Sequence, residues 1–371
     1  MRLSRGRSRA PAEGRYLHPL VPGPSLQGNP LGSPAERELH VYLPPGYDQE
    51  PGRRYPVLYF LHGYGALPPT IVCLQAIKAI VPRPLRPLVS GLARRIPTLE
   101  TLDALILSGE LPPFLLVQPD GSLHRPHLHA ARGLDGELFW KGSFFADSPR
   151  TGSYAQYVLG DVVDHVDRTY RTLASREGRA LIGGSMGGYG VLLGGILHPE
   201  RFAVLAALSP VIGFLEMREL VLLRPYYRLL LGAAAAAARG REDLEDILET
   251  CDWVFGADRE GWGGADLGGM AARTPGALRG VRLLVNCAED DEFGLTGPCR
   301  RFAERLEGLG LPCELEIYAA RGLNRLSPHA VGIAGRILPA IRFCLGGMAG
   351  DSTGATTGGP PPGAPRPGSG G

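Results

Sequence analysis

The amino-acid sequence predicts an α/β fold, in which a mostly parallel central sheet carries helices on both faces and receives inserted cap segments. Short apolar runs suited to buried strands alternate along the chain with segments of helical periodicity. One such run ends in Gly-x-Ser-x-Gly and continues into a helix-compatible segment. Acidic residues and a histidine follow the later runs, at strand ends where α/β folds place their active sites.

Composition is that of a globular protein. Of the 371 residues, 44% are hydrophobic and 20% are charged, and the net charge of +2 gives no reason to expect a nucleic-acid partner. The six cysteines form no Cys-x-x-Cys pair, so we expect reduced, mostly buried thiols. The basic N-terminus has no apolar h-region after it and no apolar run reaches membrane-spanning length, so the expected compartment is the cytoplasm. The sequence does not indicate an oligomeric state.

The chain divides into a leader, one domain and a tail. Residues 1–35, rich in Pro, Gly, Ser and Arg, are predicted to form a loose leader, and the Gly/Pro-rich residues 349–371 a disordered tail. The domain between them, 36–348, has insertions at about 65–110 and 214–278. We interpret these insertions as cap or lid elements, and extra surface helices without a catalytic role explain them equally well.

Alternation defines the expected elements of the domain. Apolar or alternating runs predict strands at 38–43, 55–61, 114–117, 202–208, 281–285 and 313–318, besides the run that ends at 184. Helical spacing predicts helices at about 153–170 and 331–345, and a further helix after residue 185. Strands that alternate with helices imply the parallel sheet.

The run that ends in Gly183-Gly184-Ser185-Met186-Gly187 is the strongest functional signal. It has the pattern of a nucleophile elbow, a sharp strand-to-helix turn that lifts one serine hydroxyl clear of the sheet. Gly183 and Gly187 leave room where side chains would clash around the turn. The backbone N–H of Met186 would then point at a developing oxyanion. Ser185 is therefore a candidate nucleophile.

A serine nucleophile needs a base and an orienting acid, which follow it in the chain order acid and then histidine. The strand predicted at 281–285 runs into four acidic residues at 289–292, and residue chemistry alone does not select one of them. A solvated acidic turn is the expectation for the other three. Only two histidines follow Ser185. His198 is expected to cap the helix after the elbow, which leaves His329, before the final helix, as the base.

The second oxyanion donor is expected after an early strand. His62-Gly63-Tyr64 follows the run 55–61 directly, and a glycine there lets the backbone approach a substrate. The N–H of Tyr64 is the candidate donor, and His62 is expected to anchor the loop.

No metal or cofactor is predicted. His124, His127 and His129 have a spacing that could hold a metal, but no acidic or cysteine partner accompanies them in the pattern. The sequence also has no phosphate loop and no dinucleotide fingerprint after a strand.

Several stretches resemble one family of α/β hydrolases. The segments 41–48 and 55–63, the segment 147–157 and above all 170–210, around Ser185-Met186-Gly187-Gly188-Tyr189-Gly190, are similar to the Putative esterase family. That family includes S-formylglutathione hydrolase (esterase D), feruloyl and acetylxylan esterases, enterochelin esterase and mycolyltransferases. The resemblance covers about 36–63, 114–120, 144–213 and 281–345. It implies an α/β-hydrolase fold with a Ser-His-Asp triad and no cofactor.

The resemblance also implies roles. It makes Ser185 the nucleophile, Met186 and Tyr64 the oxyanion donors and Asp291 the acid, with Asp290 as the fallback. The family usually has Gly-His soon after its last strand, whereas this chain has Gly322-Leu323 there and His329 several residues later. A short loop insertion would reconcile the two patterns.

The sequence thus predicts a serine carboxylesterase that works through an acyl-enzyme on a small ester. An acyltransferase with the same triad, in which an alcohol or sugar replaces water, is the nearest alternative. A non-catalytic binding protein with the same fold is a second one, which the late histidine would explain. The apolar cap segments favour an acyl group of some bulk.

Overall fold

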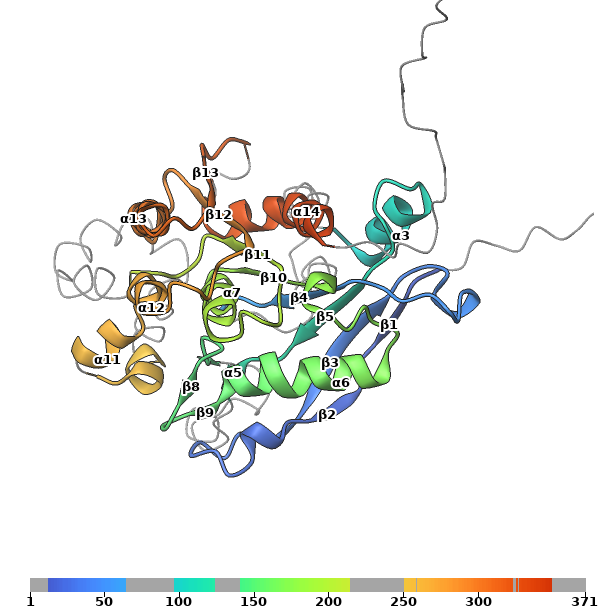
Figure 1. The fold of residues 1–371 in the computed structure, drawn as a ribbon, viewed down its shortest axis with the longest axis horizontal. Coiled ribbons are helices and arrows are strands. Elements are labelled where there is room, and N and C mark those ends of the chain that lie inside the picture. The colour runs from blue at the N-terminus through green and yellow to red at the C-terminus, as the bar shows by residue number, and fades with distance from the viewer. Residues whose placement is uncertain are drawn as a thin grey trace, which may run out of the picture.

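A computed structural model of the chain describes residues 13–64, 97–123, 141–213, 250–257, 259–322, 325 and 327–348. The central sheet of this part has nine strands in the order β1-β3-β5-β4-β10-β11-β12-β13, and β2 pairs with β3 beside β1 (Figure 1). These strands are β1 (Arg15–Leu17), β2 (Leu20–Pro22), β3 (Glu36–Leu43), β4 (Val57–Leu61), β5 (Leu115–Pro119), β10 (Arg179–Gly184), β11 (Val204–Leu208), β12 (Arg282–Ala288) and β13 (Glu314–Tyr318).

From β5 to β13 all neighbouring strands are parallel, and β3 is antiparallel to β1, β2 and β5. The parallel strands therefore share one carboxyl edge. The predicted strands are confirmed, with ends that differ by no more than three residues. Two further antiparallel pairs are formed by β6 (Ser122–Leu123) with β7 (Lys141–Gly142) and by β8 (Asp147–Ser148) with β9 (Gly152–Ser153).

Helices cover both faces of the sheet, as predicted. They are α3 (Leu99–Leu107), α5 (Tyr154–Gln156), the π-helical η4 (Tyr157–Asp161), α6 (Val162–Thr169), α7 (Met186–Leu197), α11 (Arg259–Gly264), α12 (Leu267–Arg273), α13 (Thr296–Gly308) and α14 (Ala330–Gly347). Short 3-10 turns are η1 (Pro24–Leu26), η2 (Tyr47–Gln49) and η5 (Arg176–Gly178). In Figure 1, α3 and α14 lie above the sheet, α7 and α12 lie on its other side, and α6 crosses in front of β2 and β3.

Successive side chains of the strands point to opposite faces of the sheet and pack into two separate hydrophobic cores. In β4, Val57, Tyr59 and Leu61 belong to the larger core, under α6, α7, α12 and α13. Leu58 and Phe60 belong to the smaller core, with α3 and α14 on the other face. Every residue of β4 is buried, which explains why this strand is continuously apolar in sequence.

The expectation of a loose leader over 1–35 is wrong for the described residues after 13. There β1 pairs with β3 from Leu17↔Val41 to Arg15↔Leu43, and β2 pairs with it from Leu20↔Glu38. Composition misled the prediction, because two short strands at a sheet edge carry too few residues to show a period of two. Residues 349–371 lie outside the described residues.

The two predicted insertions are described only in part. In the first, α3 packs on the sheet through Leu102, and Tyr42 Oη donates to Asp103 Oδ1 at 2.6 Å, so α3 covers the smaller core. In the second, Trp262 and Leu267 are buried in the larger core, and α12 contacts α7. Residues 65–96 and 214–249 lie outside the described residues.

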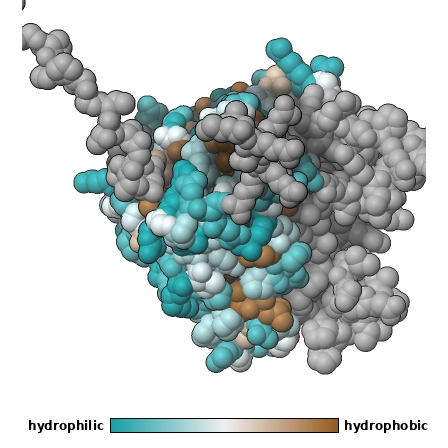
Figure 2. Space-filling view, turned by 90° about the vertical axis from the view of Figure 1, so that its right-hand side faces the viewer, coloured by the Kyte–Doolittle hydropathy of each residue, from teal (hydrophilic) through white to brown (hydrophobic). Residues whose placement is uncertain are grey.

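Among the described helices, α14 is long and apolar enough to cross a membrane by composition. Its apolar side, which includes Ala334, Ile337 and Ile341, is buried in the smaller core against β10 and β11. Its hydrophobicity thus has an explanation within the fold. The molecular face turned toward the right of Figure 1 is largely hydrophilic where it is described, with small separate hydrophobic areas (Figure 2).

The described cysteines are free thiols, as predicted. Cys251, Cys287, Cys299 and Cys344 are buried and Cys313 is half-buried. Burial raises the pKa of the Cys313 thiol to about 12, so it stays protonated at neutral pH.

Candidate active site

Ser185 stands at a strained turn at the carboxyl end of β10. Its backbone angles, φ 58° and ψ −120°, are rare for a residue with a side chain. Three backbone hydrogen bonds hold this conformation: Ser185 N donates to Leu208 O (2.9 Å), and Ser185 O accepts from Val211 N and Tyr189 N (both 3.1 Å). All other residues from 178 to 196 are buried, whereas Ser185 is partly exposed. The turn therefore presents one side chain to the outside.

The glycines of the turn are required by close backbone approach, as predicted. A Cβ on Gly187 would lie 2.0 Å from Leu61 O, and one on Gly183 would lie 2.6 Å from the carbonyl carbon of Gly187. The elbow and the end of β4 are thus in direct contact through atoms that cannot move aside.

The loop after β4 lies beside the elbow. A Cβ on Gly63 would be 3.7 Å from the Cβ of Ser185. A Cβ on Gly142 would meet both Met186 Sδ (1.9 Å) and Tyr64 Cδ2 (3.2 Å), so one glycine separates the side chains of the two predicted oxyanion residues. Met186 is also the first residue of α7, where backbone N–H groups lack acceptors within the helix.

His62 fixes this loop, as expected. Gly121 N donates to His62 Nε2 at 3.0 Å, so Nδ1 carries the proton and donates to Gly63 O at 2.9 Å. Complete burial lowers the pKa of the ring, which favours this neutral form. The neutral imidazole ties the loop to the end of β5.

Asp291 and His329 are hydrogen-bonded across 38 residues of sequence, with 2.8 Å between His329 Nδ1 and Asp291 Oδ2. Both residues are buried. Phe293 N donates to the other carboxylate oxygen at 3.0 Å, and the Cys287 thiol lies 3.7 Å from Oδ2. Asp290, the fallback, is exposed. Because Nδ1 faces the carboxylate, Nε2 is the nitrogen left to face a substrate.

Glu292 is exposed, as expected for the acidic turn, but it also makes hydrogen bonds that the sequence did not predict. Its Oε2 accepts from His329 N at 2.7 Å, and its Oε1 accepts a short hydrogen bond from Ser327 Oγ. Ser327 Oγ in turn accepts from Ala330 N at 3.0 Å. Glu292 thus fastens the start of α14. These contacts join residues that are 35 to 37 positions apart, so no local sequence pattern predicts them.

The start of α14 packs against the elbow. A Cβ on Gly184 would lie 2.6 Å from Ile333 Cγ2, and Ile333 N donates to His329 O at 2.8 Å. The ring of Phe293 stacks edge-on against His329, with 4.8 Å between centroids. His198, in contrast, ends α7 as predicted, and its Nδ1 lies 3.5 Å from Glu200 Oε1. Of the two histidines, only His329 is paired with an acid of the 289–292 turn.

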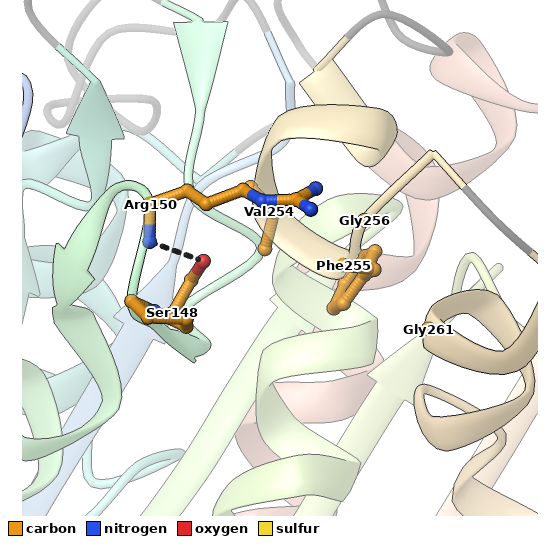
Figure 3. Close-up of a pocket in the computed structure, with 7 residues that line it drawn as sticks. Ser148, Arg150, Val254, Phe255, Gly256 and Gly261 are labelled. Atoms are coloured by element: carbon orange, nitrogen blue, oxygen red, sulfur yellow. Dashed lines mark hydrogen bonds between the residues drawn. The ribbon is translucent and has the colours of Figure 1, made fainter.

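An aromatic group lies next to α7. Phe144 contacts Tyr64, Tyr189 and Phe255, with centroids 6.4, 5.9 and 5.5 Å away. Phe255 also lines a cavity of about 310 Å³ with Ser148, Pro149, Arg150, Val254, Gly256 and Gly261 (Figure 3). The Arg150 side chain extends over this cavity toward Val254, and its Nη1 donates to Asp252 O at 3.1 Å. The backbone of Phe144 is in the left-handed region, with a φ of 55° that is uncommon for a residue with a side chain.

The histidines 124, 127 and 129, with Leu323, lie outside the described residues. For the rest, the parallel sheet, the serine elbow after β10 and the histidine loop before the last helix define an α/β hydrolase.

Within that class, residues 33–241 match the model of the family described as Putative esterase. The match covers more than half of the chain, and the chain belongs to this esterase family.

Similar structures have the same fold. A ferulic acid esterase superposes with a TM-score of 0.53 at 19% identity, over 90% of this chain and 100% of that one. An S-formylglutathione hydrolase from Agrobacterium tumefaciens superposes with a TM-score of 0.54 at 17% identity, over 91% and 95%. A curated Endo-1,4-beta-xylanase/feruloyl esterase of Xylanibacter ruminicola is 27% identical over 173 residues, which are 46% of this chain and 19% of that relative's length.

Proposed function

We propose that this protein is a carboxylic ester hydrolase that works through a serine acyl-enzyme. The observation that carries the proposal is the buried pair of Asp291 and His329, 2.8 Å apart, in which His329 stands at the start of a helix that packs against the strand end before Ser185. A strained, partly exposed serine beside such a pair has the parts of a Ser-His-Asp triad. Esterase family membership supports the same chemistry.

In the proposed mechanism His329 Nε2 takes the proton of Ser185 Oγ while this oxygen attacks the ester carbonyl. Asp291 orients the ring and stabilises the imidazolium that forms. The tetrahedral intermediate collapses as the imidazolium returns its proton to the leaving alcohol, which leaves an acyl-serine. Water, deprotonated by the same histidine, then releases the acid and restores Ser185.

The oxyanion of both intermediates would be held by the N–H groups of Met186 and Tyr64. The first lies at the N-terminus of α7, where the helix dipole favours negative charge. The second lies on the loop that His62 fixes, so the two donors are set before a substrate arrives.

The aromatic group suggests the kind of ester. Phe144 and Phe255 contact Tyr189 of α7, and Phe255 also lines the cavity of about 310 Å³, which is large enough for part of a small apolar or aromatic ester. The similarity to a feruloyl esterase and a ferulic acid esterase is compatible with an aromatic acyl group here. We therefore propose that Phe255 contacts the bulkier side of the ester.

The test is hydrolysis of p-nitrophenyl acetate, butyrate and octanoate by the wild-type protein, Ser185→Ala and His329→Ala. Loss of at least about a thousandfold in kcat in both variants is the expected result. Phe255→Ala should raise KM for octanoate more than for acetate, whereas Phe343→Ala, on the opposite sheet face, should change neither.

Two results would overturn the proposal. One is an inert wild-type protein whose Ser185 also fails to react with a fluorophosphonate probe. The other is hydrolysis that survives Ser185→Ala. Release of a new ester in place of the acid when an alcohol is added would show that the acyl group is passed to an alcohol rather than to water.

A further inference from the structure

The N-terminal edge of the sheet brings two histidines and a glutamate together, far from the serine elbow. Glu38 and His40 are two residues apart on β3, so their side chains lie on the same face. His18 follows β1, whose register Tyr16↔Tyr42 and Leu17↔Val41 leads to the position opposite His40. The strand β3 is three places from β10 in the sheet, to the right of β10 and below it in Figure 1.

The distances within this cluster are close to those of a metal site. Glu38 Oε1 lies 3.6 Å from His18 Nδ1 and 3.9 Å from His40 Nε2, and one ligand atom from each residue falls within 4.8 Å of the others. Ligand atoms bound tetrahedrally at about 2.1 Å from an ion are about 3.4 Å apart. Small side-chain rotations of His18 and Glu38, both half-exposed, would close the difference.

His40 has an unmet bonding capacity. The residue is 6% exposed, and its Nδ1 has no hydrogen-bond partner in the described part of the chain. Its Nε2 is too far from Glu38 for a hydrogen bond. Burial lowers the pKa of the ring, so the imidazole is neutral at pH 7 and has a lone pair to offer.

The neighbouring strand β5 also has a buried polar atom without a hydrogen-bond partner among the described residues. Gln118 is the register partner of His40 on β5, and its buried Oε1 also has no partner among the described residues. Residues paired in this way carry their side chains on one face. A His40 Nδ1–H donated to Gln118 Oε1 would satisfy both atoms and direct the lone pair of Nε2 toward Glu38. This is the arrangement in which metal-binding histidines are usually held.

We propose that His18, Glu38 and His40 bind one Zn²⁺ ion, with water in the fourth position. Two imidazole nitrogens and one carboxylate oxygen form a donor set that suits zinc, whereas magnesium and calcium prefer oxygen ligands alone. The spacing of the histidines did not predict this site, because His18 reaches His40 only through the pairing of β1 with β3.

The ion would link the connection between β1 and β2 to the strand β3. His18 and Pro19 are the link between these short strands, and Leu39 N already donates to Pro19 O at 2.9 Å. A bound ion that is absent from the unfolded chain stabilises the fold by mass action. Zinc should therefore raise the thermal midpoint and slow hydrogen exchange of the amides of 15–22.

The experiment is zinc titration of the full chain by calorimetry, with Co²⁺ as a spectroscopic substitute. We expect one equivalent bound at micromolar or lower Kd and a visible absorption band of tetrahedral cobalt. His18→Ala, a half-exposed position that should fold normally, is expected to weaken this site at least tenfold, and Glu38→Gln to do the same.

Two controls keep the test specific. His165→Ala removes another partly buried histidine, whose Nε2 contacts only Thr169 Oγ1 (3.3 Å) in the described structure, and should change nothing. The joint replacement of His124, His127 and His129 by Asn should leave the His18-dependent equivalent in place. The proposal is overturned if zinc binding is absent, or if it is unchanged by His18→Ala and Glu38→Gln.

Discussion

The two halves of the candidate active site are built in different ways. The half around Ser185 consists of glycines packed against backbone, with gaps too small for a single added carbon atom. The half around His329 consists of side-chain hydrogen bonds from the 289–292 turn to residues 35 to 38 positions further along. The first is encoded in five consecutive residues, whereas the second exists only after β12 and α14 have come together.

This difference predicts two kinds of sensitivity. Changes around Ser185 should damage folding and activity together, because the turn and the sheet share the same atoms. Changes around His329 should reduce activity while the fold persists, because hydrogen-bonding groups can be replaced there without filling space.

The largest expected effect separates the two adjacent aspartates. Asp291→Asn should lower kcat for p-nitrophenyl butyrate by about ten-thousandfold, because the amide no longer stabilises the imidazolium and favours the wrong tautomer of His329. Asp290→Asn, on the exposed neighbour, should stay close to wild type. The measurement is steady-state kinetics with circular dichroism as the check on folding. Equal losses in the two variants would contradict the assignment of the acid.

Next is a change in the other half. Gly187→Ala places a Cβ 2.0 Å from Leu61 O, and we expect it to lower the free energy of unfolding by about 3 kcal/mol, with activity lost in parallel. Gly308→Ala adds the same methyl group at the end of α13, where nothing lies within 4 Å. Urea unfolding compares them, and Gly308→Ala should be neutral or slightly stabilising. A Gly187→Ala protein as stable as wild type would break the comparison.

A smaller effect concerns Glu292, which acts through His329. Glu292→Ala removes the acceptor for His329 N and Ser327 Oγ, and should lower kcat about tenfold while KM and stability change little. Glu292→Gln, which keeps one acceptor, should recover part of this loss. The matched control is Glu289→Ala, another exposed glutamate of the same turn. If kcat is unchanged and only stability falls, Glu292 has a structural role alone.

The smallest effect is a pH dependence of stability from His62. Its pKa in the folded protein lies below the unfolded value, so the unfolded chain binds more protons in acid. The stability is complete above about pH 6.5 and falls as the pH drops below this unfolded pKa. His40 contributes in the same direction. Urea unfolding at several pH values should show a shallower fall in His62→Gln than in wild type. An unchanged pH profile would show that His62 does not titrate during unfolding.

Most of the fold could be predicted from the sequence, because the parallel strands are buried on both faces and such strands are visible as apolar runs. The position of Ser185 at a sharp turn and the need for glycine around it could also be predicted, since close backbone approach leaves no substitute for glycine. The contacts of Glu292 could not be predicted, because its partners are distant in the chain. The strands within 15–22 could not be predicted either, because they are too short to show the alternation of a strand. His329 was reached by elimination, since only two histidines follow the elbow.

The pairing of β1 and β2 with β3 also protects the molecule from its own copies. Each short strand covers one half of the outer side of β3, whose backbone groups would otherwise form an open row eight residues long. An uncovered strand of this length with Leu39, Val41 and Leu43 in it is a template for intermolecular pairing. A chain that begins at residue 36, where the sequence analysis placed the start of the domain, should therefore aggregate even though its candidate catalytic residues are intact.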